Sequence, residues 1–143
     1  MKNNNETKKL NNKGFSLVEL IIVIAIMAVL IGVLAPQYLK YVEKSRQSAD
    51  LDTVDAMISA VEIYSSDPAN SIVSDSIKCA AGVVTADAQA LAALTDAGIT
   101  LPASPTKLMK SNAYQDWTIT FSDAGLTFST SDDGPALKTA MGR

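Results

Sequence analysis

Hydrophobic and polar residues fall into successive blocks along the 143-residue chain. Residues 1–14 are polar, rich in Lys and Asn and without helical periodicity, so we expect this segment to be disordered. From Phe15 to Ala35, 18 of 21 residues are apolar. A helix of that length spans about 31 Å, which is close to the hydrocarbon thickness of a bilayer. The pattern therefore predicts a membrane-inserting helix over residues 15–36.

The apolar block gives way to an amphipathic one. Residues 37–64 contain neither Gly nor Pro. Their apolar positions recur with the i, i+3, i+4, i+7 spacing of a single helix face: Val54, Met57, Ile58 and Val61. We predict that the helix continues over residues 37–66 and ends at Asp67-Pro68, because proline has no backbone N–H to extend it.

The remaining segment, residues 67–143, mixes short helical and extended patterns. Thr85 to Ala97 predicts a helix with Thr85 as its N-cap and with Leu91 and Leu94 facing inward. Weak strand signals occur at Ile72-Val73 and Val83-Val84, and a last helical turn is predicted over Pro135–Met141.

The clearest strand pattern lies near the C-terminal end. Trp117, Ile119 and Phe121 alternate with polar residues, which predicts a half-buried strand. A turn over residues 122–125 then leads to a second strand that runs to Thr130. We therefore predict an α+β fold, in which a long N-terminal helix packs against a small head with an antiparallel sheet.

Composition excludes several function classes. The chain has 12 Lys and Arg against 15 Asp and Glu, a net charge of -3 that argues against a basic nucleic-acid binder. The absence of histidine excludes histidine-based triads and His–metal sites. The one cysteine, Cys79, cannot form an intramolecular disulfide, and we predict that it is a small buried residue.

No catalytic or cofactor-binding arrangement stands out. The acidic residues are scattered, so no general acid–base pair is evident and we predict that the chain is not an enzyme. Asp132-Asp133-Gly134 could contribute to a calcium site, but calcium needs six to eight oxygen ligands and a turn is the preferred interpretation. We predict neither a metal nor another cofactor.

Charge around the apolar segment predicts its orientation. Lysines precede the segment and none lies within it, so we expect the N-terminus in the cytoplasm and the C-terminal part outside. A permanent anchor and a secretory signal peptide are alternatives, although Pro36 would fit poorly after a cleavage at Ala35. Neither alternative explains Glu19, because a carboxylate near the centre of an apolar span costs about 2.5–3.5 kcal/mol. Such a residue usually has a partner, and the segment itself supplies none.

The run Lys13-Gly14-Phe15-Ser16-Leu17-Val18-Glu19-Leu20, followed by Ile, Val and Leu, resembles the prepilin signature of type IV pilins and pseudopilins. The resemblance covers about residues 13–65. It implies that a prepilin peptidase cleaves after Gly14 and methylates the new N-terminus at Phe15. It further implies that Glu19 sets the register of assembly and that Pro36 bends the helix.

The resemblance also implies a function. The chain would be a structural subunit of a type IV pilus, in which residues 15–36 form a helical homo-oligomer with roles in adhesion or motility. Its partners would be prepilin peptidase, the pilus assembly platform and the cytoplasmic membrane, and the final location an extracellular filament. A pseudopilin of a secretion or DNA-uptake system is one alternative, and a membrane-anchored binding domain that never polymerises is another. A single cysteine departs from pilins with a C-terminal disulfide loop.

Charged residues at three- and four-residue spacing lie on a further surface of the predicted helix: Lys40, Glu43, Arg46 and Asp50. A solvated helix face is the preferred interpretation of this pattern, and salt bridges between subunits are the alternative.

Overall fold

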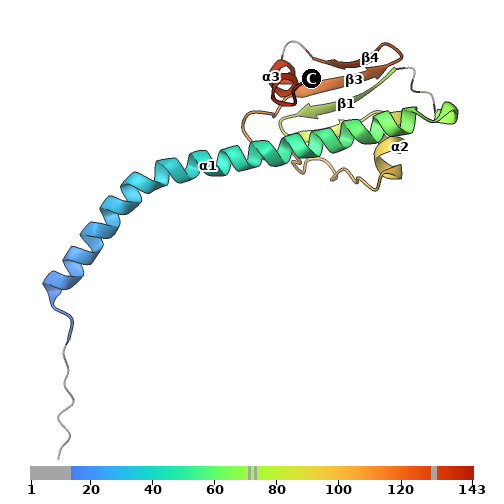
Figure 1. Ribbon diagram of the computed structural model, residues 1–143. Helices are drawn as coiled ribbons and strands as arrows, with labels where there is room; N and C mark the ends of the chain where they lie inside the picture. Colours follow the sequence, from blue (N-terminus) through green and yellow to red (C-terminus); the bar gives the residue numbers. More distant parts are fainter. Residues whose placement is uncertain (1–13, 71, 73, 130–131) are drawn as a thin grey trace, which may run out of the picture. The chain divides into compact units, whose positions relative to one another are not determined.

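The computed structural model describes residues 14–70, 72, 74–129 and 132–143 (Figure 1). The chain divides into two compact units at Leu39/Lys40. In chain order the elements are α1 (Leu17–Ser65), the 3-10 turn η1 (Pro68–Asn70), β1 (Ser74–Ala80), β2 (Val83–Ala86), α2 (Ala88–Asp96), β3 (Trp117–Ser122), β4 (Gly125–Phe128) and α3 (Gly134–Ala140). The α+β class is confirmed, whereas the expected disorder of the leader concerns residues that lie almost entirely outside the described part.

Helix α1 is close to the prediction in extent. It begins two residues after Phe15 and ends one residue before Ser66, and the helical assignment is continuous through Pro36. Pro68 opens the short turn η1, and the carboxylate of Asp67 accepts a hydrogen bond from the backbone N–H of Ala69 at 2.9 Å. This local bond stabilises a turn in place of a further helical turn.

The sheet is larger than the two confidently predicted strands. Within the described residues four antiparallel strands lie in the order β2-β1-β3-β4. The weak signal at Val83-Val84 is confirmed by β2. Of the other weak signal, Ile72 precedes β1, which begins at Ser74, and Val73 lies outside the described residues. A two-residue loop joins β1 to β2, and its residues Ala81 and Gly82 have φ values of 50° and 81°. Positive φ at both positions is typical of the tight turns that match the twist of antiparallel strands.

The predicted hairpin near the C-terminal end is confirmed. Trp117, Ile119 and Phe121 on β3 are buried and alternate with half-exposed Thr and Ser. Strand β4 pairs with β3 from Ser122↔Gly125 to Ile119↔Phe128. Strand β4 ends at Phe128 and the next residue, Ser129, is not part of it, so the strand is shorter than predicted; Thr130 itself lies outside the described residues.

Helix α2 differs from the prediction at its start and on its inner face. Thr85 pairs with Lys78 in the β1–β2 ladder, so it belongs to β2 and the N-cap residue is Asp87. The buried face contains Ala90, Ala93 and Leu94, whereas Leu91 is 45% exposed. The buried face therefore lies about 100° around the helix axis from Leu91. Its small alanines allow the helix to approach the sheet closely.

The hydrophobic core belongs to the C-terminal unit, residues 40–143. The predicted stripe on α1 is confirmed, since its four residues are at most 1% exposed: Val54, Met57, Ile58 and Val61. They form one cluster with the inward side chains of the sheet, among them Ile77, Trp117 and Ile119. The predicted C-terminal helix is present as α3, from which Leu137 enters the same core.

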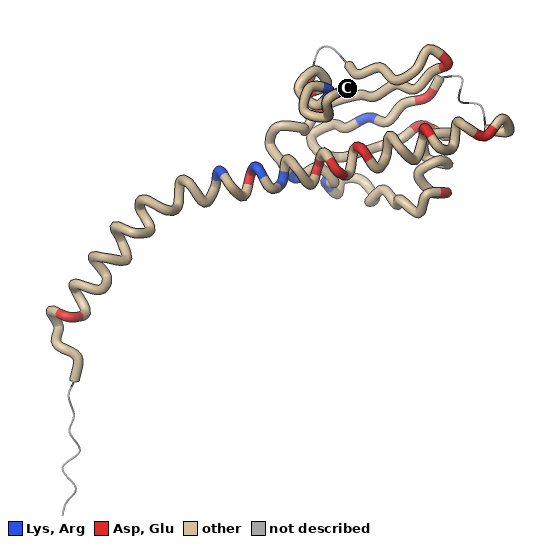
Figure 2. The backbone as a smooth tube through the Cα atoms, in the orientation of Figure 1, with Lys and Arg blue, Asp and Glu red and all other residues tan. Residues whose placement is uncertain are grey.

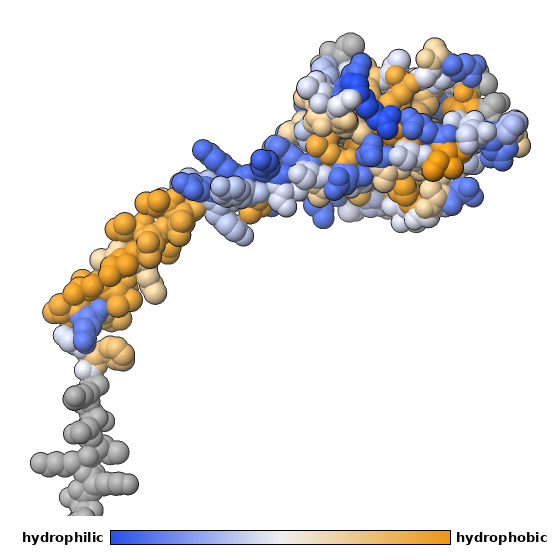
Figure 3. Space-filling model, in the orientation of Figure 1, coloured by the Kyte–Doolittle hydropathy of each residue, from blue (hydrophilic) through white to orange (hydrophobic). Residues whose placement is uncertain are grey.

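The N-terminal unit presents a different surface. Its described part, residues 14–39, consists of a short segment without regular secondary structure and the first half of α1. Figure 3 shows an almost uniformly apolar surface along this half-helix, and Figure 2 shows one acidic position near its start. That position is Glu19, the one charged residue between Phe15 and Leu39.

Candidate functional site: the start of helix α1 and its apolar surface

The first turn of α1 is closed by a reciprocal pair of side chains. The backbone N–H of Ser16 donates to Glu19 Oε2 at 2.8 Å, and the backbone N–H of Val18 donates to Ser16 Oγ at 3.3 Å. The carbonyl oxygen of Ser16 accepts the N–H of Leu20 at 3.2 Å, which opens the helical ladder. Ser16 and Glu19 therefore form a capping box, in which a Ser at the N-cap and a Glu three residues later satisfy backbone donors of the first turn.

This geometry corrects one expectation. The sequence was expected to supply no partner for Glu19 within the apolar segment, but the N–H of Ser16 is such a partner. The signal that identifies it is the spacing Ser-x-x-Glu directly before an apolar run.

The predicted cleavage residues lie outside the helix. Gly14 and Phe15 precede the first helical residue, and neither has a regular backbone conformation. Phe15 is 94% exposed, and a Cβ added to Gly14 would meet no atom within 4 Å. The peptide bond between them is therefore accessible from solvent in the described chain.

The half-helix that follows exposes its large apolar side chains all round. Among Leu17 to Leu39 these residues are 47–73% exposed, and Pro36 lies within the same helix. The helix is long and apolar enough to cross a membrane. An exposed apolar surface of this extent marks a segment that is covered by lipid or by other protein chains, because soluble monomers rarely leave such surfaces in water.

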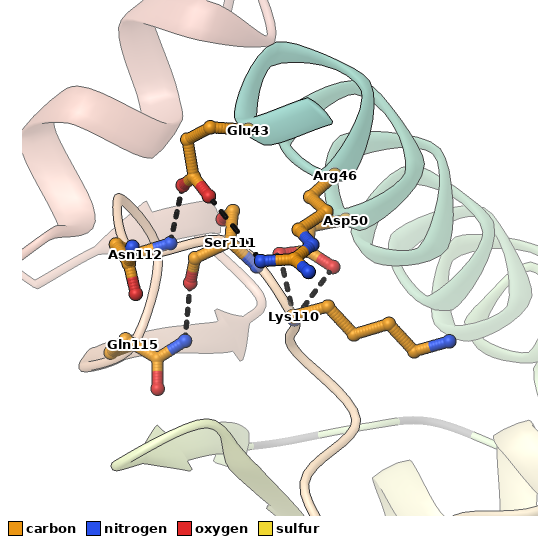
Figure 4. A network of polar contacts seen from close by, with 7 residues as sticks. All are labelled: Glu43, Arg46, Asp50, Lys110, Ser111, Asn112 and Gln115. Carbon is orange, nitrogen blue, oxygen red and sulfur yellow. Dashed lines mark hydrogen bonds and ion pairs between the residues drawn. The ribbon is translucent and has the colours of Figure 1, made fainter. Parts of the chain in front are cut away.

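The charged face predicted on the amphipathic half of α1 is only partly solvated. Asp50 is 3% exposed, and its carboxylate accepts backbone N–H groups from the loop before β3 (Figure 4). The N–H of Lys110 lies 3.0 Å from both oxygens, and the N–H of Ser111 lies 2.7 Å from Oδ2. The preferred interpretation of a solvated face is therefore wrong for Asp50, which anchors a loop 60 residues away.

Further side chains contribute to the contact between α1 and the loop before β3. Glu43 accepts a hydrogen bond from the backbone N–H of Asn112, and it lies 3.9 Å from the guanidinium of Arg46. The side chain of Gln115 donates to the carbonyl oxygen of Ser111. Lys40 and Lys44 are exposed and form no ion pair with the described residues.

Cys79 is buried, as predicted, with 2% of its surface exposed. Its thiol donates to the carbonyl oxygen of Gln115 at 3.1 Å. Burial raises the pKa of Cys79 to about 12, so the thiol is not a nucleophile at neutral pH.

The carboxylates of Asp132 and Asp133 accept hydrogen bonds from backbone N–H groups in the described structure. Asp133 Oδ2 accepts the N–H groups of Gln115 and Asp116 at 2.8 and 3.0 Å, and Asp132 Oδ1 accepts that of Gly134 at 3.1 Å. No group of three or more Cys, Asp or Glu residues arranged to hold a metal ion is found within the described ranges.

Comparison with known families finds a match in the N-terminal segment. Residues 9–35 match the family described as the prokaryotic N-terminal methylation motif. The chain therefore carries the type IV prepilin-like signal, joined to an α+β head consistent with the pilin fold. The motif and the fold together support a type IV pilin-like or pseudopilin protein. No solved structure matches the chain.

Proposed function

We propose that the chain is the precursor of a type IV pilus subunit, which is processed at its N-terminus and polymerised through its first helix into a surface filament. The observation that carries this proposal is the methylation motif on an apolar helix whose side chains are exposed on every side. A membrane covers such a helix before assembly, and equivalent helices of other subunits would cover it in a filament.

Processing divides the chain into parts with different roles. Removal of the basic leader, residues 1–14, occurs between Gly14 and Phe15 and is followed by methylation of the Phe15 amine. Residues 15–36 then serve as the membrane and assembly helix, residues 37–66 as its amphipathic continuation, and residues 67–143 as the exported head. The subunit passes from the cytoplasmic membrane, through an assembly platform, to the outside of the cell, where it serves adhesion or motility.

Two residues of the apolar helix have specific roles in this proposal. The carboxylate of Glu19 pairs with the Phe15 amine of a neighbouring subunit, because an unpaired charge in an apolar bundle is strongly unfavourable and pairing selects one axial register. Pro36 bends the helix, since it lacks an N–H and its ring crowds the preceding turn.

The mass and N-terminal sequence of the protein from its native membranes test the proposal. A chain that begins at N-methyl Phe15 is the expected result. An intact Met1 or a start at Pro36 would contradict it and would favour a permanent anchor or a secretory signal peptide. Electron microscopy and mass spectrometry of sheared filaments then separate a pilus subunit from a pseudopilin, which would be processed without becoming the main filament component.

The register role is tested separately with Glu19→Ala. We expect normal processing but a strongly reduced filament yield. Asp52→Ala is the matched control, because Asp52 is an exposed acid on the same helix with no hydrogen bond or ion pair to the described residues. A normal yield of Glu19→Ala filaments would contradict the register role.

A further inference from the structure

The N-terminal boundary of α1 is set by side chains rather than by a change in hydrophobicity. Phe15 is as apolar as the residues that follow, so hydrophobicity alone would let the helix begin earlier. The capping box instead fixes the first helical residue at Leu17, with Ser16 as the N-cap. An N-cap residue has non-helical backbone angles, and therefore the residues before it leave the helix.

This boundary lies two residues beyond the Gly14–Phe15 bond. Peptidases bind substrates in extended form, and a bond within a helical turn has to unfold before it can enter an active site. An alanine at position 16 would favour helix and would remove the cap. The next acceptable N-cap toward the N-terminus is Gly14, and a helix that started there would include Phe15 in its first turn.

We propose that Ser16 is a positioning residue for leader removal, because its cap stops α1 at Leu17 and keeps the Gly14–Phe15 bond outside the helix. The inference rests on the proposed processing of the chain. In that step one water molecule hydrolyses the amide, leaving the carboxylate on Gly14 of the leader and a free amine on Phe15. Ser16 takes no part in the bond chemistry and acts through the conformation of the two residues before it.

Glu19 contributes less to this positioning than Ser16 does. When Glu19 is replaced, the hydroxyl of Ser16 still accepts the N–H of Val18 and its carbonyl still opens the helical ladder. The N–H of Ser16, which loses its partner, lies at an exposed position where water replaces the carboxylate. Leader removal and register therefore depend mainly on different residues of the same turn.

The test is a time course of cleavage of the full-length precursor in membranes by prepilin peptidase, for Ser16→Ala, Ser16→Thr and Ser16→Gly. Loss of an N-cap corresponds to about a fivefold change in a conformational equilibrium. Because the rate follows the fraction of precursor with the bond outside the helix, we expect kcat/KM of the Ala variant to fall by about two- to fivefold and that of the Thr variant to stay within about twofold of wild type. Ser48→Ala is the matched control, since Ser48 is an exposed α1 serine whose hydroxyl only donates to the Lys44 carbonyl.

The Gly variant separates positioning from direct recognition of the hydroxyl. Glycine lacks a side chain but is an N-cap almost as good as serine, so the positioning role predicts nearly normal cleavage. If Ala and Gly are equally slow, the peptidase contacts the hydroxyl itself and the inference is wrong. If the Ala variant is cleaved at the wild-type rate, the inference is also wrong.

A structural measurement distinguishes failure of the Ser16 inference from failure of the proposed function. The ¹³Cα chemical shift of Phe15 in the micelle-bound precursor should move toward helical values in Ser16→Ala and should not move in Ser16→Gly. Unchanged shifts in the Ala variant would contradict the inference while leaving the proposed function intact. Failure of the wild-type precursor to be cleaved after Gly14 would instead overturn the proposed function.

Discussion

Replacement of Asp50 should destabilise the head more than any other acidic substitution on α1. Its side chain reaches from the helix to the loop before β3, where it accepts two successive backbone N–H groups (Figure 4). Asp50→Ala removes both acceptor atoms and leaves these donors without a partner. The size of the effect depends on how much water can reach each donor.

The two donors differ in exposure. Lys110 is exposed, so water can replace the carboxylate and the cost is about 1 kcal/mol. Ser111 is 0% exposed, so its N–H bears the desolvation cost of a buried unpaired donor, about 2–3 kcal/mol. We therefore expect Asp50→Ala to lower the free energy of unfolding by about 3–4 kcal/mol, a large part of the 5–15 kcal/mol typical of a domain. Asp50→Asn keeps one acceptor oxygen and should lose about 1–2 kcal/mol.

Urea unfolding of the full chain in mild detergent measures this loss. Trp117 is the only tryptophan and is fully buried, so its fluorescence reports on the core of the head. With an m value of about 2 kcal/mol/M, the midpoint for Asp50→Ala should fall by about 1.5–2 M. Asp52→Ala, two residues away and exposed, should change the free energy of unfolding by less than about 0.5 kcal/mol. Equal midpoints for the two variants would refute the anchoring role of Asp50.

Three further outcomes follow from the structure. Glu19→Gln keeps an oxygen for the capping box but removes the charge, so leader cleavage should stay normal while filament yield falls; a normal yield would show that the charge is not needed. Because the raised pKa of Cys79 is about 12, the folded state retains a proton that the unfolded state loses from about pH 9 upward. Stability should therefore decline less steeply above pH 9 in Cys79→Ser than in wild type, as urea titrations at several pH values can check. Gly82→Ala should be more destabilising than Gly98→Ala, because both have positive φ but only at Gly82 would a Cβ crowd a backbone atom, the carbonyl oxygen of Met109 at 3.1 Å; equal thermal midpoints would contradict this.

Regular elements of the fold were predictable because each has a local periodic signal. The stripe from Val54 to Val61 and the alternation from Trp117 to Phe121 place the same side chains in the core that the structure buries there. Strand β1 was harder to find, because its buried positions include Asp75 beside Ile77. The Asp75 carboxylate accepts the backbone N–H of Ala90 at 2.7 Å, so a polar residue occupies a core position for a tertiary reason.

The same distinction applies to the candidate site. Gly14, Phe15 and Glu19 could be proposed as site residues from sequence because the prepilin-like signal is contiguous, and the family match over residues 9–35 spans these positions. The capping role of Ser16 also has a local signal, the spacing Ser-x-x-Glu, but the apolar pattern of the same segment is stronger and was interpreted first. Asp50 carried no local signal at all, since its partners lie 60 and 61 residues further along the chain.

Carboxylates that bind backbone N–H groups explain much of the acidic character of the head. The segment between α2 and β3 has few ladder partners for its N–H groups, and buried donors require acceptors. A carboxylate suits this task because it accepts several hydrogen bonds and needs no acceptor in return. The acids that do so lie on five different parts of the C-terminal unit, residues 40–143: Glu43, Asp50, Asp67, Asp75, Asp116, Asp132 and Asp133. Net negative charge here is therefore in part a consequence of ordering irregular backbone, and it cannot be taken on its own as a surface for a cationic partner.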